Sequence, residues 1–236
     1  MALDLKIDVY ADGADIRDML SARTAGIVRG FTTNPTLMRK SGISDYESFA
    51  REALTAVAGM PISFEVFADD FGEMERQAKR IATWGDGVYV KIPVTNTRGD
   101  SAVALVKRLS AAGVKLNITA VLTVEQVRAI TEALDADVPA IISIFAGRIA
   151  DTGRDPVPIV REAVAIARAK PKAQVLWASP RELLNIFQAE ACGCHIITVT
   201  NEILKKLAMV GKSLDELSLD TVKMFFNDAA AAGFNL

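Results

Sequence analysis

The sequence alternates eight times between a short run rich in β-branched residues and a longer segment in which apolar residues recur at helical spacing. Gly, Pro, Asp and Asn separate these segments, and no long linker interrupts them. The predicted strands span residues 5–11, 27–33, 62–68, 88–94, 115–121, 140–147, 174–179 and 195–200. The predicted helices span residues 14–22, 45–57, 71–83, 101–112, 124–133, 156–169, 180–189 and 201–209, and a last helix spans 218–231.

This alternation predicts an α/β fold, because strands that alternate with helices form parallel sheets. Closing eight parallel strands into a barrel removes both unpaired sheet edges. We therefore expect a single (βα)8 TIM barrel domain over residues 1–236, with an additional C-terminal helix. An open, doubly wound sheet is the alternative. It would need a Gly-rich fingerprint after the first strand, which Ala11-Asp12-Gly13-Ala14-Asp15 does not match.

The predicted last helix carries apolar side chains at helical spacing, namely Leu219, Val222, Phe225 and Phe226. Such a stripe needs an apolar surface to pack against. Two partners fit the pattern equally well: the barrel of the same chain, or a second subunit of a homo-oligomer.

Composition excludes several classes of protein. The 27 basic and 29 acidic side chains give a net charge of −2, which disfavours nucleic-acid binding. No apolar run approaches the roughly 18 residues of a membrane span. A single histidine, His195, disfavours metal enzymes that need several His ligands, so no metal is expected. Cys192 and Cys194 are too close in sequence to frame a secreted scaffold, which favours the cytoplasm.

Polar side chains interrupt the predicted strands or directly follow them. Both faces of a barrel strand are usually apolar, and polar residues near strand C-termini mark the active site of such barrels. The interrupting residues are Asp8, Asn34, Glu65, Lys91, Asn117 and Thr119, and Arg148, Ser179 and Arg181 follow the sixth and seventh strands. Each one alone also has a structural explanation, such as a cap or an ion pair; Arg148 or Arg181 could pair with Asp151.

Lys91 carries the strongest chemical signal, because it stands in the middle of Val88-Tyr89-Val90-Lys91-Ile92. Partial burial disfavours the charged ammonium and frees the amine to attack a carbonyl. Asp8 and Glu65 are candidate proton carriers, and Thr119 could hold a water. The amides of Asn34 and Asn117 suit sugar hydroxyls, and Arg148 and Arg181 suit a terminal phosphate. Together these residues indicate a metal-free aldol site for a phosphorylated sugar.

Several segments make the chain resemble the transaldolase family, in its compact form whose length is closer to fructose-6-phosphate aldolase. They are GFTTNPTL (30–37), VKIPVT (90–95), LNIT (116–119), IFAGRIAD (144–151) and VLWAS (175–179). The resemblance implies that Lys91 forms a Schiff base with the substrate. It further implies that Asp8 is the acid/base aspartate, and that Glu65 with Thr119 positions a catalytic water. By the same resemblance Asn34, Asn117 and Phe145 contact substrate, while Arg148, Ser179 and Arg181 bind its phosphate.

Two subfamilies share these segments, and Glu65, Phe145 and Asn117 resemble the transaldolases. The fructose-6-phosphate aldolases carry Gln and Tyr at the first two positions and lack the Asn. The resemblance thus implies transfer of a dihydroxyacetone unit from a ketose phosphate, fructose 6-phosphate or sedoheptulose 7-phosphate, to an aldose phosphate in the pentose phosphate pathway. It also implies that this reaction uses no metal and no organic cofactor. Pro180 stands where the family usually has an aromatic residue.

Other functions remain as alternatives. One is a free aldolase acting on fructose 6-phosphate, or an aldolase of a specialised pathway. A non-catalytic phosphosugar-binding protein is another, although it would need no nucleophile like Lys91. A phosphate-binding isomerase also leaves Lys91 unexplained.

Overall fold

The computed structural model describes residues 5–234, and its centre is a closed barrel of eight parallel strands. Neighbouring strands follow in chain order, and the last strand pairs with the first. The strands are β1 (Asp8–Asp12), β2 (Gly30–Thr32), β3 (Ile62–Glu65), β4 (Val88–Pro93), β5 (Leu116–Val121), β6 (Ala140–Ile144), β7 (Ala173–Trp177) and β8 (Ile196–Thr200). The predicted α/β TIM barrel is confirmed.

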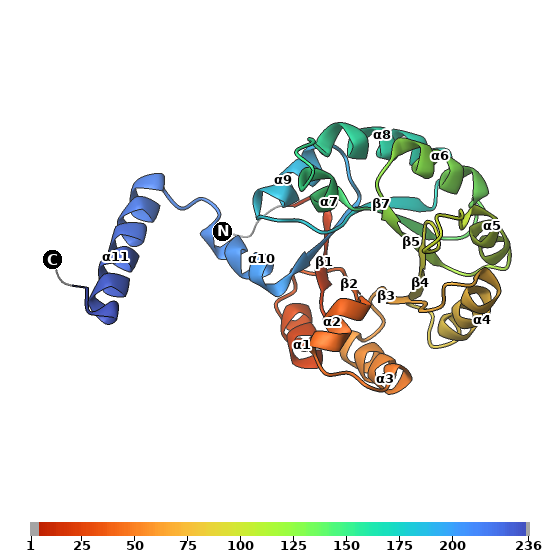
Figure 1. The fold of residues 1–236 in the computed structure, drawn as a ribbon, viewed down its shortest axis with the longest axis horizontal. Helices are drawn as coiled ribbons and strands as arrows, with labels where there is room; N and C mark the ends of the chain where they lie inside the picture. The colour runs from red at the N-terminus through yellow and green to blue at the C-terminus, as the bar shows by residue number, and fades with distance from the viewer. Residues whose placement is uncertain (1–4, 235–236) are drawn as a thin grey trace. The chain divides into compact units, whose positions relative to one another are not determined.

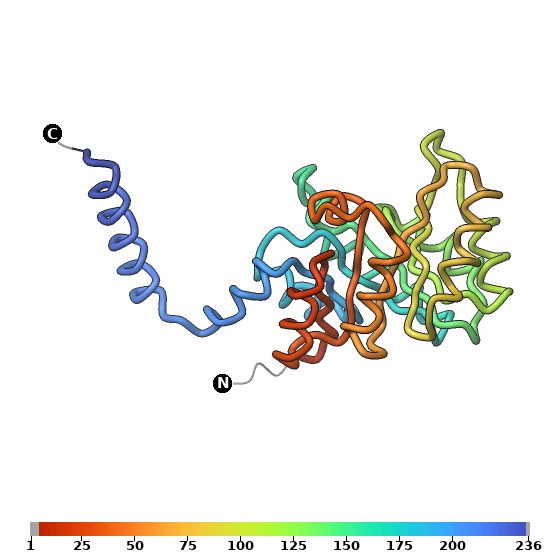
Figure 2. Tube along the Cα trace, turned by 90° about the horizontal axis from the view of Figure 1, so that it is seen from below, coloured from red at the N-terminus to blue at the C-terminus, as the bar shows by residue number. Residues whose placement is uncertain are grey.

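Helices surround the barrel, as Figure 1 shows, and Figure 2 traces the backbone after a turn of the view by 90°. Those that follow the first to fourth strands are α1 (Ile16–Thr24), α2 (Pro35–Lys40), α3 (Tyr46–Val57), α4 (Phe71–Ala82) and α5 (Val103–Ala111). The later ones are α6 (Val124–Ala133), α7 (Ala146–Ala150), α8 (Val157–Ala167), α9 (Leu184–Ala191) and α10 (Asn201–Lys206). After them the chain forms the 3-10 turn η1 (Leu207–Met209) and the helix α11 (Leu214–Ala232). No helix among residues 5–234 is long and apolar enough to cross a membrane.

Side-chain caps set where several helices begin. Asp15, Asp45 and Asp70 each accept a backbone N–H of the first turn of the following helix. Thr123 and Gln126 form a reciprocal capping box at the start of α6. Each cap satisfies N–H groups that have no partner inside the helix, which favours a helix start at that residue.

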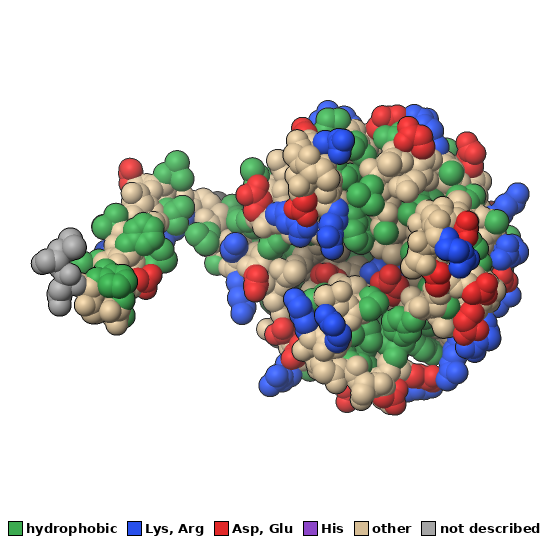
Figure 3. Space-filling model, viewed as in Figure 1, with side chains coloured by type: hydrophobic (Ala, Val, Ile, Leu, Met, Phe, Trp, Pro, Cys, Tyr) green, Lys and Arg blue, Asp and Glu red, His purple; other side chains and the backbone are tan. Residues whose placement is uncertain are grey.

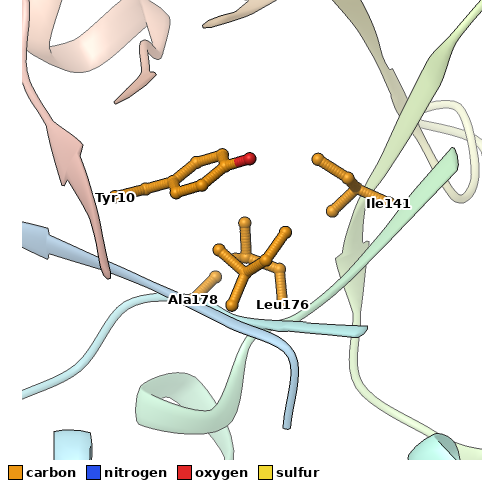
Figure 4. Packing of buried hydrophobic residues seen from close by; sticks show 5 residues of the cluster. Tyr10, Ile141, Leu176 and Ala178 are labelled. Atoms are coloured by element: carbon orange, nitrogen blue, oxygen red, sulfur yellow. The ribbon is translucent and has the colours of Figure 1, made fainter. Parts of the chain in front are cut away.

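A cluster of buried side chains packs inside the barrel (Figure 4); its members are Tyr10, Ile141, Leu176, Ala178 and Ile196. The Tyr10 ring packs against Gly30, its register partner on the neighbouring strand β2. A Cβ atom at residue 30 would lie 2.5 Å from this ring. The glycine that opens the GFTTNP segment is therefore needed to make room for Tyr10.

The chain divides into two compact units. The first, Met1–Leu204, contains the barrel, and the second is Lys205–Leu236. In the second unit, Ser213 caps α11 by accepting the backbone N–H of Glu216, and Gly233 ends it with a φ of 68°. The helix begins four residues before the predicted start at residue 218. The Ser-x-x-Glu pattern of residues 213–216 is the signal that would have placed the start correctly. A single domain over residues 1–236 stays a prediction.

Some predicted elements differ from the observed ones at the C-terminal end of the barrel. β1 runs to Asp12 rather than ending at Ala11, and β6 ends at Ile144 because the chain turns there into the short helix α7. The short helix α2 was not predicted; it begins at Pro35, with Asn34 as its cap. Proline at the first helical position and an Asn cap are both helix-start signals.

Candidate active site

A cavity of about 470 Å³ opens at the C-terminal end of the barrel strands. Figure 3 shows this face, with acidic and basic side chains visible in the hollow at its middle. Nine of the ten predicted site residues line the cavity: Lys91, Glu65, Thr119, Asn34, Asn117, Phe145, Arg148, Ser179 and Arg181. Asp8 is the exception.

Strand register places three of these residues side by side. Glu65 on β3 is the register partner of Lys91 on β4, and Lys91 is the partner of Asn117 on β5. In-register residues of parallel strands point to the same face. The carboxylate, the amine and the amide therefore form one row across the inner wall of the barrel.

The Lys91 side chain is 8% exposed, and its Nζ atom has two oxygen partners. Nζ donates to the backbone carbonyl oxygen of Thr33 at 2.9 Å and lies 3.1 Å from Glu65 Oε2. These contacts hold the amine at the base of the cavity, where a substrate carbonyl can reach it.

Asp12, rather than Asp8, is the aspartate that lines the cavity, so the structure does not bring Asp8 together with the other nine predicted residues. Asp8 pairs with Ile196 at the start of β8, whereas Asp12 pairs with Thr200 at its end. At about 3.3 Å per residue, four residues along the strand separate the two carboxylates by about 13 Å. The ring of Tyr10, buried between them, fills the barrel interior. The first strand was predicted to end at Ala11, one residue too early, which left Asp12 in a loop.

Asp12 is held by hydrogen bonds from two side chains of the TTNP segment. Oδ1 accepts from Thr32 Oγ1 at 2.7 Å, and Oδ2 accepts from Asn34 Nδ2 at 3.3 Å. Burial raises the pKa of Asp12, while the positive charge of Lys91 and the bonds from Thr32 and Asn34 partly lower it. A carboxyl group whose pKa is raised holds its proton to higher pH, as a proton carrier must.

Both asparagines have structural partners as well as cavity positions. Asn117 is fully buried; its Nδ2 donates to Ser63 Oγ at 3.0 Å, and its Oδ1 accepts from Ser143 Oγ at 2.6 Å. Asn34 caps α2, since its Oδ1 accepts the backbone N–H of Leu37 at 3.0 Å. These bonds fix the orientation of each amide at the cavity wall.

A bulge in β5 shapes the cavity beside Thr119. The register to β6 shifts between Ile118 and Val121, and Ala120 has a φ of 60°, in the left-handed region. An extra residue in one strand re-aims the neighbouring side chains. Thr119 and Ala120, although consecutive, both line the cavity.

The rim opposite Glu65 carries the predicted phosphate-binding residues. Arg148 on α7 and Arg181 in the loop before α9 are exposed, and Ser179 has a left-handed φ of 59°. Arg181 donates to both carboxylate oxygens of Asp151, with Nε 3.0 Å from Oδ1. The hydrogen bonds from Arg181 hold the pKa of Asp151 below its usual range, and the charge of Arg148 adds to this. The ion pair considered for Asp151 in the sequence is therefore present, and it uses Arg181.

The cavity is also lined by polar residues that were not predicted from the sequence. Besides Asp12 they include Thr32, Ser143, Thr198 and Thr200. Thr32 Oγ1 lies 2.6 Å from Thr198 Oγ1 and so extends the hydrogen-bond network from Asp12 across to β8. A signal existed for Thr198 and Thr200, because these two hydroxyl residues stand at alternate positions in the otherwise apolar β8.

Residues 9–236 match the family model described as transaldolase/fructose-6-phosphate aldolase. The chain belongs to this family. Among curated transaldolase relatives, a probable transaldolase of Dehalococcoides mccartyi is 35% identical over 200 residues, or 84% of this chain and 89% of the relative. A probable transaldolase of Streptococcus agalactiae is 33% identical over 84% of this chain and 88% of the relative.

The chain also has the same fold as a solved structure of low sequence identity. A crystal structure of KGPDC from Streptococcus mutans, determined with a bound ligand, superposes with a TM-score of 0.54. The superposition covers 83% of this transaldolase-family chain and 88% of the other chain at 12% identity. At that identity the two proteins share the barrel fold.

Proposed function

We propose that the protein is a transaldolase that moves a dihydroxyacetone unit from a ketose phosphate to an aldose phosphate through a Schiff base on Lys91. The observation that carries the proposal is the buried amine of Lys91 at the base of the cavity, between an acidic partner and the barrel wall. Membership of the transaldolase/fructose-6-phosphate aldolase family supports the same reaction class.

The chemistry begins when the neutral amine of Lys91 attacks the ketose carbonyl and water leaves, which yields a protonated imine. The imine accepts the electron pair of the C3–C4 bond as it breaks, while the C4 hydroxyl loses its proton and the aldose phosphate departs. Asp12 is the proposed proton carrier, and Glu65 with Thr119 the proposed holder of water for imine formation and hydrolysis. Addition of the bound three-carbon unit to a second aldose phosphate completes the transfer.

The polar rim supplies substrate recognition in this proposal. The amides of Asn34 and Asn117 bind sugar hydroxyls, and the ring of Phe145 forms an apolar part of the cavity wall. Arg148, Ser179 and Arg181 bind the phosphate, for which paired guanidinium groups are well suited. Use in the pentose phosphate pathway, cytoplasmic location and phosphorylated sugars as the partners are parts of the same proposal.

Borohydride trapping tests the proposal directly. Reduction in the presence of fructose 6-phosphate should leave a stable three-carbon adduct on the peptide that contains Lys91. Lys91→Ala should abolish both the adduct and transfer to erythrose 4-phosphate, whereas Lys115→Ala, which changes a partly exposed lysine bonded to the Asp86 carbonyl, should preserve both.

Three outcomes separate the competing functions. Release of free dihydroxyacetone without need for an acceptor would indicate an aldolase instead of a transaldolase. Binding of sugar phosphates without an adduct would indicate a non-catalytic binding protein. An adduct on another lysine would contradict the assignment of Lys91.

A further inference from the structure

The hydroxyl of Tyr46 makes two hydrogen bonds to the backbone of Glu65. It accepts the Glu65 N–H at 2.8 Å and donates to the Glu65 carbonyl oxygen at 3.0 Å. A phenolic hydroxyl has one proton and free lone pairs, so it can make both bonds at once. Tyr46 is the first residue of α3 and does not line the cavity that holds Lys91.

These two bonds replace the next step of the β2–β3 ladder. Phe31 N–H donates to the Pro61 carbonyl, and Thr33 N–H donates to the Ser63 carbonyl. In a parallel ladder the pattern repeats every two residues. Its continuation would join the Glu65 N–H to the Thr33 carbonyl, and the Glu65 carbonyl to the backbone nitrogen of residue 35.

Neither of those ladder bonds is formed. Residue 35 is a proline, which has no N–H to donate. The carbonyl of Thr33 accepts the ammonium group of Lys91 at 2.9 Å. The Tyr46 hydroxyl therefore supplies the donor that Pro35 lacks and the acceptor that Lys91 occupies.

The position of the Tyr46 ring is fixed by packing. Its centroid lies 4.5 Å from that of Phe67, 5.4 Å from that of Trp84 and 6.0 Å from that of Phe64. Asp45 accepts the Ser48 N–H at 3.1 Å and fixes the start of α3 at Tyr46. Burial raises the pKa of the Tyr46 hydroxyl, so the group keeps its proton and remains both donor and acceptor.

We propose that Tyr46 is a positioning residue of the active site: by taking the place of the β2 ladder groups, it leaves the Thr33 carbonyl to Lys91 and holds Glu65 beside the Lys91 amine. The role rests on the proposed function, in which Glu65 and Lys91 act on the substrate. Tyr46 itself touches neither the cavity nor the phosphate-binding rim.

Tyr46→Phe keeps the ring and removes only the hydroxyl. The Glu65 N–H then has the Thr33 carbonyl as its ladder acceptor, in competition with Lys91. One neutral hydrogen bond corresponds to about a 10-fold change, so kcat should fall about 10-fold while KM for fructose 6-phosphate stays within about twofold. Tyr89→Phe is the matched control, because it removes a phenol from β4 that does not line the cavity, and it should leave both constants unchanged.

A double-mutant cycle with Glu65→Gln distinguishes positioning from a general loss of stability. If Tyr46 acts through Glu65, Tyr46→Phe should lower kcat about 10-fold in the parent and less than about twofold in the Glu65→Gln background. The rate of borohydride trapping of Lys91 with dihydroxyacetone is measured in all four proteins as well, because it needs no acceptor sugar and reports even on slow variants. Circular dichroism at the assay temperature confirms that each variant is folded.

Equal losses of kcat in both backgrounds together with an unchanged rate of borohydride trapping of Lys91, or no loss in either background, would overturn the role of Tyr46 and leave the proposed function intact. A parent protein that neither turns over substrate nor yields an adduct on Lys91 would instead contradict the proposed function, and the role of Tyr46 with it.

Discussion

Asp151 holds the guanidinium group of Arg181 through both carboxylate oxygens, at the rim where the phosphate of a substrate is proposed to bind. The pair is about half exposed, with 46% of the Arg181 side chain and 47% of the Asp151 side chain accessible. Exposed ion pairs contribute about 0–1 kcal/mol, so a phosphate dianion can replace Asp151 on Arg181 at small cost.

Asp151→Asn should therefore strengthen phosphate binding, because it removes both a competitor for Arg181 and a repelling charge. We expect KM for fructose 6-phosphate to fall by about two- to fivefold, and KM for fructose to stay unchanged. Steady-state kinetics with both sugars measure this, with the surface variant Asp137→Asn as control. An increase of KM for the phosphorylated sugar would mean that Asp151 orients Arg181 for the ligand.

Arg148→Ala and Arg181→Ala should each raise KM for phosphorylated sugars by about 10-fold or more, since a charged hydrogen bond is worth about 1.5–3 kcal/mol. The same changes should hardly affect unphosphorylated fructose, which lacks the contact. Equal losses on both sugars would show that the arginines support the loops around α7 instead of the phosphate.

Asp12→Asn and Asp8→Asn form a matched pair on one strand. Asp12 lines the cavity and Asp8 does not, although both occupy the same face of β1. A positioned acid/base group contributes about 10² to 10⁴ in rate, so Asp12→Asn should lower kcat by that factor and Asp8→Asn by less than about threefold. The reverse order in steady-state kinetics would return the acid/base role to Asp8.

The raised pKa of Asp12 also predicts how stability depends on pH. Between the usual carboxyl pKa of 3.8 and the higher value in the folded state, the folded protein keeps a proton that the unfolded chain has released. The free energy of unfolding contributed by this group therefore falls as pH rises through that window. Asp12→Asn has no such proton, so its stability relative to the parent should increase with pH there and then level off. Urea denaturation across this pH range measures the difference, and a constant difference would contradict the shift.

Gly147 allows α7 to lie against the loop that carries Ser179. A Cβ atom at residue 147 would lie 1.5 Å from the Ser179 carbonyl oxygen. Overpacking typically costs about 1–3 kcal/mol, so Gly147→Ala should lower the free energy of unfolding by at least that amount. It should also raise KM for phosphorylated sugars, since Ser179 must move. Gly13→Ala is the control, because nothing lies within 4 Å of its Cβ position. Denaturation curves that coincide for the two variants would exclude the close contact.

The sequence by itself determined the barrel and which polar side chains gather at one end of it. Eight alternations of strand and helix favour a closed parallel barrel over other parallel sheets. Polar residues such as Lys91 and Glu65 are conspicuous in strands whose other residues are apolar. The ends of parallel strands converge at one face of a barrel, which is why nine of the ten predicted residues line one cavity.

Only the tertiary structure decided where each strand ends and which side chains from distant segments contact each other. Asp12 lines the cavity because β1 continues to this residue, one position beyond the predicted end, where it pairs with Thr200 of β8. Local β propensity does not report such pairing. Arg181 is hydrogen-bonded to Asp151, 30 residues away in sequence, and Tyr46 is hydrogen-bonded to Glu65, 19 residues away. The spacing of residues along the chain shows which side chains share a face, whereas the partner of each polar group is set by how the loops and helices pack above it.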